Sequence, residues 1–482
     1  MVLDTDTCYR ALEARDRRFE GQFFVGVRST GVYCRPGCPA PMPKRRNVSF
    51  FACAAAAESA GYRPCLRCRP DALPGSPAWN GTHATVARAL RLIEAGGLDE
   101  GGVESLAERL GVGTRHLRRL FHEQLGTSPV AVARTRRAHF ARKLIEETGL
   151  SMTDVAASAG FGSLRSFNTT MRATFQRRPS DLRDGRTARG RDAGVRLRLP
   201  FREPFDWDGI LGYLRDRATA GVESVDGDAY RRSVSIDGRP GLLAVRPAGA
   251  GHLELRLTAL PSPGLMATAA KVSRMFQLDA DTRRIAAHLR SDALLRRALR
   301  GEAAPRVPVG WDPFELAVRA VLGQQVSVKG ATTLAGRLVA ACGTPLPEDV
   351  SEGSVTHLFP SPADVAEARV ERIGIPGARA EALRGLAVAV RDGRIRLDGR
   401  DPDAFVEELT ALPGIGDWTA QYVAMRGLGE PDAFPAGDLG VRRALARDGR
   451  LPSVADVRRR AEAWRPWRAH AAVALWRSGI GG

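Results

Sequence analysis

Four of the seven cysteines form two short-spaced pairs, Cys34-x3-Cys38 and Cys65-x2-Cys68, with 26 residues between the pairs. Two such pairs suit tetrahedral Zn²⁺, because each closes a tight turn and the intervening chain brings the pairs together. A segment of this size has a limited core, so a bound metal would contribute much of its folding free energy. The spacing predicts one zinc ion on four thiolates, and both a structural zinc ribbon and a reactive thiolate centre fit it.

A short segment near the C-terminal end has the spacing of a DNA-backbone site. Leu412–Gly416 (LPGIG) precedes a helical run, and Asp438 follows 22 residues past Gly416 in the phrase FPAGDLGV. The glycines permit a tight turn, and the N–H groups at the start of the next helix can bind a phosphate. The pattern predicts a helix-hairpin-helix in which Gly414 and Gly416 contact DNA.

A repeated pattern between residues 103 and 175 predicts two helix-turn-helix motifs. Leu106-Ala107 with Gly111 recurs as Val155-Ala156 with Gly160, offset by 49 residues. In each copy the alanine lets two helices approach and the glycine takes the turn. The helix that follows each turn could enter a major groove, where arginine and asparagine read guanine and adenine edges. The candidate base-reading residues are Arg115, Arg118 and Arg119 in the first copy and Arg165, Asn168 and Arg172 in the second.

The charge of the chain favours a polyanionic partner. It carries 72 Lys+Arg against 54 Asp+Glu, a formal net charge of +18, and its hydrophobic fraction of 44% excludes a disordered or fibrous protein. No apolar run is long enough for a membrane span, and the mixed charges of residues 1–18 are unlike a secretory signal. We therefore expect a cytoplasmic protein that binds nucleic acid and no membrane.

The cysteine pairs lie in phrases that resemble the N-terminal zinc domain of the Ada family. These are Val27–Cys38 (VRSTGVYCRPGC), Asn47–Phe50 (NVSF) and Gly61–Cys68 (GYRPCLRC). The resemblance implies that Cys34, one of four zinc ligands with Cys38, Cys65 and Cys68, accepts a methyl group from a DNA methylphosphotriester. Arg35, Lys44, Arg45 and Arg46 would hold the phosphate backbone. Because methylation removes one negative charge beside the DNA, the reaction would also tighten promoter binding.

The segment after the zinc domain resembles the AraC-family DNA-binding domain. The phrases that carry the resemblance are Phe121–Pro129 (FHEQLGTSP) and Phe175–Pro179 (FQRRP). This resemblance implies sequence-specific binding to promoter DNA and transcriptional activation, with RNA polymerase as a partner.

The C-terminal half resembles the helix-hairpin-helix DNA glycosylases, and among them the AlkA 3-methyladenine glycosylases. Besides the hairpin, the resemblance rests on Phe205–Leu214 (FDWDGILGYL), Ala320–Ser327 (AVLGQQVS) and Arg465–Trp476 (RPWRAHAAVALW). It implies that Asp438 stabilises oxocarbenium character at the sugar. Trp418, Tyr422 and Trp476 would hold a flipped, cationic alkylated base by stacking and cation–π attraction, although each ring could equally be core.

Three departures within this half refine the expectation. Trp418 stands where strand-cutting members of the superfamily carry a Schiff-base lysine, which predicts a monofunctional glycosylase. No C-terminal four-cysteine group is present, which predicts no iron–sulfur cluster, and no organic cofactor is expected. Gln325 occupies the place where some relatives insert a leucine wedge into the duplex.

The predicted fold class is a multidomain α+β protein of four segments. We expect a small zinc α/β domain at 1–75 and an all-α double helix-turn-helix domain at 84–184. A small antiparallel α+β domain at 195–300 and an all-α glycosylase domain at 301–482 follow. Polar, Gly- and Pro-rich stretches at 71–82 and 184–194 separate the first three segments. We expect a monomer that acts on double-stranded DNA.

Two rival interpretations remain open at the level of sequence. In the first, the glycosylase half is degenerate and only binds DNA, so that the protein is a methylation-sensing transcriptional regulator. In the second, the zinc site is structural and Cys34 never reacts. The leading interpretation is a fused alkylation-damage protein, with a methyl-accepting activator joined to a 3-methyladenine DNA glycosylase.

Overall fold

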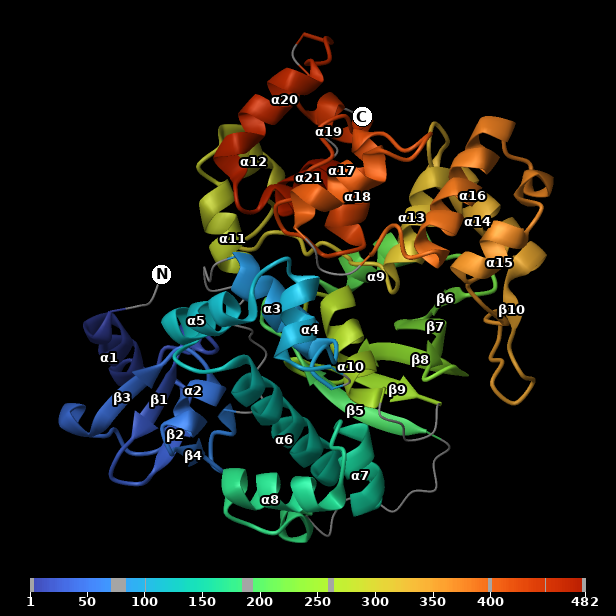
Figure 1. Ribbon diagram of the computed structural model, residues 1–482. Coiled ribbons are helices and arrows are strands. Elements are labelled where there is room, and N and C mark those ends of the chain that lie inside the picture. Colours follow the sequence, from blue (N-terminus) through green and yellow to red (C-terminus); the bar gives the residue numbers. More distant parts are fainter. Residues whose placement is uncertain are drawn as a thin grey trace. The chain divides into compact units, whose positions relative to one another are not determined.

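The computed structural model describes residues 4–70, 84–99, 101–183, 194–258, 264–397, 401–446 and 448–478. These residues form two compact units (Figure 1). Within the described residues, the first comprises those in 1–202, 236–239 and 248–271, and the second comprises those in 203–235, 240–247 and 272–482. The predicted linker at 71–82 and all but Gly194 of the linker at 184–194 lie outside the described residues. Within the described ranges, no helix is both long enough and apolar enough to cross a membrane.

The first unit begins with a small sheet covered by short helices. Its strands lie in the order β3-β1-β2-β4, with β2 antiparallel to β1 and parallel to β4. The aromatic residues of the strands pack face to edge, as in the Phe24–Tyr33 pair. The elements are α1 (Thr5–Glu13), β1 (Phe24–Val27), β2 (Val32–Cys34), β3 (Val48–Phe51), α2 (Ala54–Ser59) and β4 (Arg63–Pro64).

A wholly helical region follows, and it contains both predicted helix-turn-helix motifs. Gly111 and Gly160 have φ values of +68° and +75°, so each turn glycine adopts the left-handed conformation that the repeat requires. The long helix α6 starts at Pro129, behind a serine N-cap, and lies between the two motifs (Figure 1). The helices are α3 (Ala84–Glu94), α4 (Val103–Arg109), α5 (Thr114–Leu125), α6 (Pro129–Glu147), α7 (Met152–Ser158) and α8 (Leu164–Phe175).

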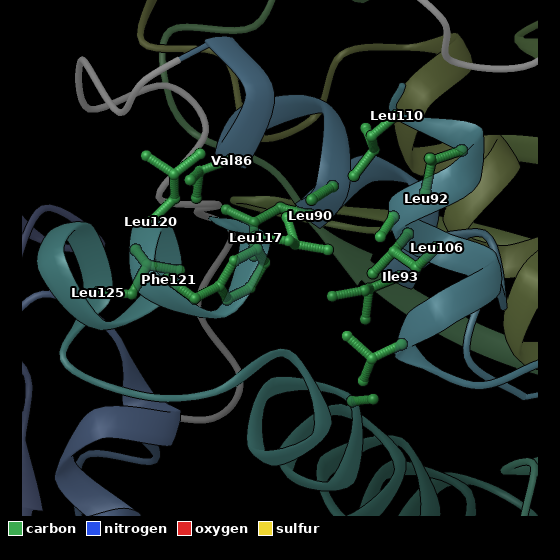
Figure 2. Close-up of a cluster of buried hydrophobic side chains, with 14 of the residues drawn as sticks. Val86, Leu90, Leu92, Ile93, Leu106, Leu110, Leu117, Leu120, Phe121 and Leu125 are labelled. Atoms are coloured by element: carbon green, nitrogen blue, oxygen red, sulfur yellow. The ribbon is translucent and has the colours of Figure 1, made fainter. Parts of the chain in front are cut away.

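The first helix-turn-helix motif has its own apolar core. Leu106, Leu117 and Phe121 are completely buried where α3, α4 and α5 meet (Figure 2). They lie at helical spacing, with Leu117 and Phe121 one turn apart on α5, so each helix presents one apolar face. This core leaves the opposite, arginine-rich face of α5 exposed to solvent.

Residues 195–257 contain the strands of a five-stranded sheet. Its order is β5-β9-β8-β7-β6, and the β5–β9 and β6–β7 pairs are antiparallel. Alternate residues of β5 are buried and exposed, as the pattern VRLRL predicts for a strand with one covered face. The strands are β5 (Val195–Pro200), β6 (Glu223–Asp226), β7 (Ala229–Ile236), β8 (Arg239–Pro247) and β9 (His252–Leu257).

The rest of the second unit is almost entirely helical. Two very short strands, β10 (Thr344–Pro345) and β11 (His357–Leu358), pair within it. The helices of this part of the chain are α9 (Trp207–Arg215), α10 (Leu265–Met275, which begins in the first unit), α11 (Thr282–Leu289), α12 (Ala293–Ala298), α13 (Pro313–Leu322), α14 (Val328–Cys342), α15 (Pro362–Glu367), α16 (Gly377–Arg391), α17 (Pro402–Thr410), α18 (Asp417–Arg426), α19 (Leu439–Ala444), α20 (Val454–Ala461) and α21 (Arg468–Ser478). The four predicted kinds of fold are therefore present, and the predicted fold class is confirmed.

Buried charges connect the sheet to the helices inside the second unit. Arg232 of β7 is 2% exposed and donates to Glu315 of α13 at 2.7 Å, while Arg319 reaches both Glu315 and Glu223. Burial alone would raise the pKa of Glu223, but the two guanidinium groups lower it. Each buried charge here has an opposite charge beside it, as folded proteins usually require.

Candidate functional site

The four cysteines of the two sequence pairs meet in one place. The sulfurs of Cys34, Cys38, Cys65 and Cys68 all lie within 4.8 Å of one another, and all four residues are buried. Hydrogen bonds from Cys34 to Cys38 and Cys68, together with burial, raise the pKa of the Cys34 thiol. The raised pKa favours the protonated thiol, whereas a divalent cation among the sulfurs would favour the thiolate. Four soft sulfur donors at this spacing fit Zn²⁺.

Strand pairing explains how distant cysteines come together. Cys34 ends β2, which pairs in parallel with β4, and the N–H of Cys65 donates to the carbonyl of Tyr33 at 3.0 Å. Successive residues of a strand point to opposite faces of its sheet. The sulfur of Cys34 therefore lies on one face, while the ring of Tyr33 lies on the other.

The basic residues predicted to hold DNA near the zinc site differ in availability. Arg45 and Arg46 are exposed, and Arg45 pairs with Asp6 and lies over the ring of Tyr9. The side chain of Arg35 is only 24% exposed and pairs with Glu20 at 3.3 Å. A phosphate would therefore have to compete with Glu20 for Arg35, a partner that the sequence did not suggest.

A partly buried polar cluster joins the zinc domain to α6 within the first unit. Glu58 accepts hydrogen bonds from Tyr33 at 3.0 Å and from Thr135 at 2.6 Å, and it lies 2.8 Å from Nε2 of His139. Burial would raise the pKa of Glu58, but these partners, His139 foremost, lower it. No motif or spacing in the sequence relates Glu58 to residues far along the chain, so this cluster was not predicted.

The second helices of the two helix-turn-helix motifs carry most of their predicted base-reading residues at the surface. Arg115, Arg118 and Arg119 of α5 are exposed, as are Arg165 and Arg172 of α8. Asn168 is half-buried, and its amide donates to the carbonyl of Leu164 at 2.9 Å. Arg118 and Arg119 also pair with exposed carboxylates. Such surface pairs are weak, so these side chains are available to nucleic acid.

The predicted hairpin lies between α17 and α18. Gly414 has a φ of +81°, and a Cβ atom there would lie 2.6 Å from the Cβ of Ala382, so only glycine fits. Both Gly414 and Gly416 are exposed, and Gly416 is the N-cap of α18. The side chain of Gln324 donates to the carbonyl of Gly414 at 3.0 Å and to the hydroxyl of Thr419 at 3.1 Å.

The loop between α13 and α14 presents the residue at the predicted wedge position. Gln325 is exposed and has a φ of +58°, a strained conformation for a residue other than glycine. Its neighbour Val326 is 39% exposed. The hydrogen bonds of Gln324 hold this loop beside the hairpin.

The carboxylate of Asp438 is held between two indoles. Asp438 is the N-cap of α19, and its Oδ1 accepts from the N–H of Val441 at 3.0 Å. The indole of Trp476 donates to Oδ1 at 2.8 Å, and that of Trp418 donates to Oδ2 at 3.0 Å. The structure therefore brings together a carboxylate and two of the three aromatic residues that the resemblance implied.

The third ring, Tyr422, completes an aromatic surface. Its centroid lies 5.3 Å from that of Trp418 with the planes 18° apart, and 6.3 Å from that of Trp476. Trp418 and Tyr422 stack on each other, so a base would have to stack on another face. All three rings are half-buried, which leaves part of each accessible.

Two residues behind Tyr422 were not singled out from the sequence. Arg426 donates to the hydroxyl of Tyr422 at 2.8 Å and also to that of Tyr213 on α9. Burial raises the pKa of Tyr213 to about 12; burial would also raise that of Tyr422, but Arg426 and Arg217 lower it. The spacing Trp418-x3-Tyr422-x3-Arg426 could have indicated that all three share one helix face.

Comparison with known proteins covers nearly the whole chain. Residues 7–71 match the family described as the metal binding domain of Ada, 106–185 a helix-turn-helix domain, 196–312 the AlkA N-terminal domain, and 318–469 the HhH-GPD superfamily base excision DNA repair proteins. A Mycobacterium tuberculosis protein named "Probable bifunctional transcriptional activator/DNA repair enzyme AlkA" is 44% identical over 479 residues, which are 98% of this chain and 96% of that protein.

Two Escherichia coli proteins match one half each. DNA-3-methyladenine glycosylase 2 is 35% identical over 285 residues, which are 58% of this chain and 95% of that protein. The bifunctional transcriptional activator/DNA repair enzyme Ada is 34% identical over 199 residues, which are 41% of this chain and about half, 53%, of that protein.

Proposed function

Because the chain belongs to the family that fuses an Ada-type zinc-binding and helix-turn-helix regulator to an AlkA-type DNA glycosylase, we propose that its two centres carry out two separate reactions on alkylated DNA. Cys34 takes a methyl group from a methylphosphotriester. Asp438 and its aromatic neighbours support hydrolysis of the bond between an alkylated purine and its sugar.

The methyl transfer uses one sulfur and consumes it. Bound zinc would keep the four thiolates deprotonated while leaving one nucleophilic. The lone pair of Cys34 forms a bond to the methyl carbon, the bond from carbon to the phosphate oxygen breaks, and an ordinary phosphodiester anion leaves. The observation that supports this role is the convergence of the four buried sulfurs within 4.8 Å.

Methylation then changes the charge that faces DNA. Four thiolates on one zinc ion carry a net charge of −2, and a thioether in place of one thiolate leaves −1. Weaker repulsion between the zinc centre and the phosphates tightens binding to promoter DNA. The exposed faces of α5 and α8 read the promoter sequence. The protein binds as a monomer and then recruits RNA polymerase. Because this gain is electrostatic, it is largest at low salt.

The glycosylase reaction rests on one observation above the others, the Asp438 carboxylate flanked by the indoles of Trp418 and Trp476. A carboxylate beside the sugar stabilises the positive charge that develops as the bond breaks. The aromatic surface holds the flipped base by stacking. With Trp418 where a lysine would form a Schiff base, the product is an abasic site in an uncut strand.

The methyl transfer is tested by intact mass after incubation with DNA that bears methylphosphotriesters. We expect one added methyl group on the full chain, located at Cys34, and none on Cys34→Ser. Cys342→Ser is the matched control, since it removes a cysteine from α14 and leaves the cluster intact. An unmodified wild-type protein would instead support the purely structural zinc site.

The glycosylase reaction is tested with duplex DNA that contains 3-methyladenine. We expect release of the free base, with strand breaks only after alkaline treatment. Breaks without alkali would refute the monofunctional mechanism. Failure of the wild-type protein to release any base, together with tight DNA binding, would favour the alternative in which this half only binds DNA.

A further inference from the structure

A buried positive charge lies behind the aromatic surface, with no carboxylate partner among the described residues. Arg426 is 5% exposed. Its guanidinium donates to the carbonyl of Pro308 and to the hydroxyls of Tyr422 and Tyr213. Among the ion pairs of the described residues none includes Arg426, whereas the equally buried Arg232 has Glu315 beside it. An unpaired buried charge is costly, so its presence beside a candidate site indicates a role there.

The helix α18 places this charge opposite Asp438. Trp418, Tyr422 and Arg426 are four residues apart and therefore share one face of the helix. At 1.5 Å of rise per residue the first and third are about 12 Å apart along the axis. Trp418 binds Asp438, and the guanidinium of Arg426 lies 5.6 Å from the centroid of the Tyr422 ring. A negative charge therefore lies beside one end of this face and a positive charge at the other.

In the proposed reaction, positive charge moves from the base to the sugar, which is the direction from Arg426 toward Asp438. When the bond between C1′ of the sugar and the nitrogen of a cationic alkylated purine breaks, the electron pair goes to the nitrogen. The base becomes neutral and the sugar becomes positive. The oxygen of a water molecule then bonds to C1′, and its proton passes to solvent. Positive charge thus leaves the base and arrives at the sugar.

We propose that Arg426, acting through Tyr422, is an electrostatic positioning residue that disfavours positive charge on the bound base and so promotes its departure. This inference rests on the proposed glycosylase function. A fixed cation behind the base destabilises the cationic ground state and does not oppose the transition state, in which the charge has moved toward Asp438. Only such differential effects accelerate a reaction. For an uncharged base, the same cation stabilises the negative charge that the departing base acquires.

The proposal therefore separates cleavage from binding. Neutralising Arg426 should slow base release and leave binding of a cationic base unchanged or tighter. If Arg426 only supported the fold or the aromatic surface, its neutralisation would weaken DNA binding and slow base release together.

The test uses the full, zinc-loaded chain and duplex DNA with a single 7-methylguanine, which is cationic. In Arg426→Gln we expect the single-turnover rate of base release to fall by about tenfold or more, from the Coulomb energy of a charge about 10 Å away. The dissociation constant for the same DNA should stay within a factor of two or decrease. Arg426→Lys keeps the charge and should recover most of the rate.

Two further variants keep the test decisive. In Tyr213→Glu a carboxylate replaces a phenol that already binds Arg426. The new carboxylate neutralises the guanidinium and pairs with it. This variant replaces Arg426→Gln if the latter does not fold. Arg306→Gln is the matched control, because Arg306 is also a buried arginine that binds backbone carbonyls and lies over an aromatic ring. We expect it to lower stability without slowing base release by folded protein.

The outcomes are distinguishable from failure of the proposed function. If the wild-type protein releases neither 7-methylguanine nor 3-methyladenine, the glycosylase proposal itself fails; if it releases only 3-methyladenine, the variants are compared on that base, which is also cationic. If it releases the base and the neutralised variants release it at the wild-type rate, or lose binding and rate in equal proportion, the role of Arg426 is overturned.

Discussion

The indole of Trp476 donates a 2.8 Å hydrogen bond to Oδ1 of Asp438, although 38 residues separate them in the chain. Trp418 makes the corresponding bond to Oδ2 at 3.0 Å. The two aromatic walls and the carboxylate are therefore positioned by one another. A change in any of the three side chains alters both the shape of the aromatic surface and the direction in which the carboxylate points.

Trp476→Phe should slow base release even though it keeps an aromatic ring and the charge of Asp438. The variant removes one donor from the carboxylate, and we expect a decrease of about 10- to 100-fold, against about 100- to 1000-fold for Asp438→Asn. Single-turnover release of 3-methyladenine measures both. Trp464→Phe is the control, because the indole of Trp464 donates to the carboxylate of Asp292 in the same way. If this variant slowed base release as much as Trp476→Phe, the cause would be a general loss of fold.

Gly414→Ala should destabilise the second unit by about 2–3 kcal/mol. The positive φ disfavours a Cβ atom, and that atom would lie 2.6 Å from the Cβ of Ala382. Gly416→Ala provides the comparison, since a Cβ atom at Gly416 would meet no other atom within 4 Å and the φ of this residue is −91°. Thermal unfolding should separate the two, and equal melting temperatures would contradict the proposed strain.

Removal of zinc should unfold residues 4–70 and spare the glycosylase reaction. The four cysteines form a small cluster of their own, with little apolar packing to replace the metal. We expect a chelator to lower the first thermal transition and to abolish methyl uptake, while base release continues. A chelated protein that melts like the zinc-loaded one would show that the cluster folds without metal.

Glu58→Gln should loosen the zinc domain from α6 without releasing zinc. The side chain of Glu58 is 10% exposed and has three hydrogen-bonding partners, and loss of its charge beside His139 should cost about 3 kcal/mol. Proteolysis and thermal unfolding, together with zinc content, measure the effect. Glu123→Gln, which removes an exposed pair with Arg119, should change stability by less than about 0.5 kcal/mol.

The second unit should lose stability as the pH falls from about 6.5 to 4. His470 is completely buried, and burial lowers its pKa to about 4. Because the unfolded chain binds a proton in this range and the folded one does not, acid favours unfolding, by up to about 1.4 kcal/mol per pH unit. Urea unfolding should show a shallower pH dependence in His470→Asn. An unchanged slope in that variant would assign the acid sensitivity to other groups.

Short-range patterns were enough to predict several features of this protein. The cysteine spacing identified the residues that form the cluster, because each pair closes a local turn. The repeated alanine and glycine located both helix-turn-helix turns, and LPGIG located the hairpin, since each depends on a few neighbouring residues. The site roles of Cys34 and Asp438 came from resemblance and remain predictions.

Contacts between distant segments were decided only by the tertiary structure. The pairing of Glu20 with Arg35, the cluster around Glu58, and the bonds from two indoles to Asp438 each join residues with no regular spacing. Such contacts depend on how strands and helices pack, and a sequence pattern with a period of two or 3.6 residues carries no information about its partner. Arg426 combines a feature that depends on local sequence with one that depends on tertiary structure. Its place on the face of α18 is local, whereas its burial, with no carboxylate beside it in the part of the chain that the structure describes, is a property of the folded protein.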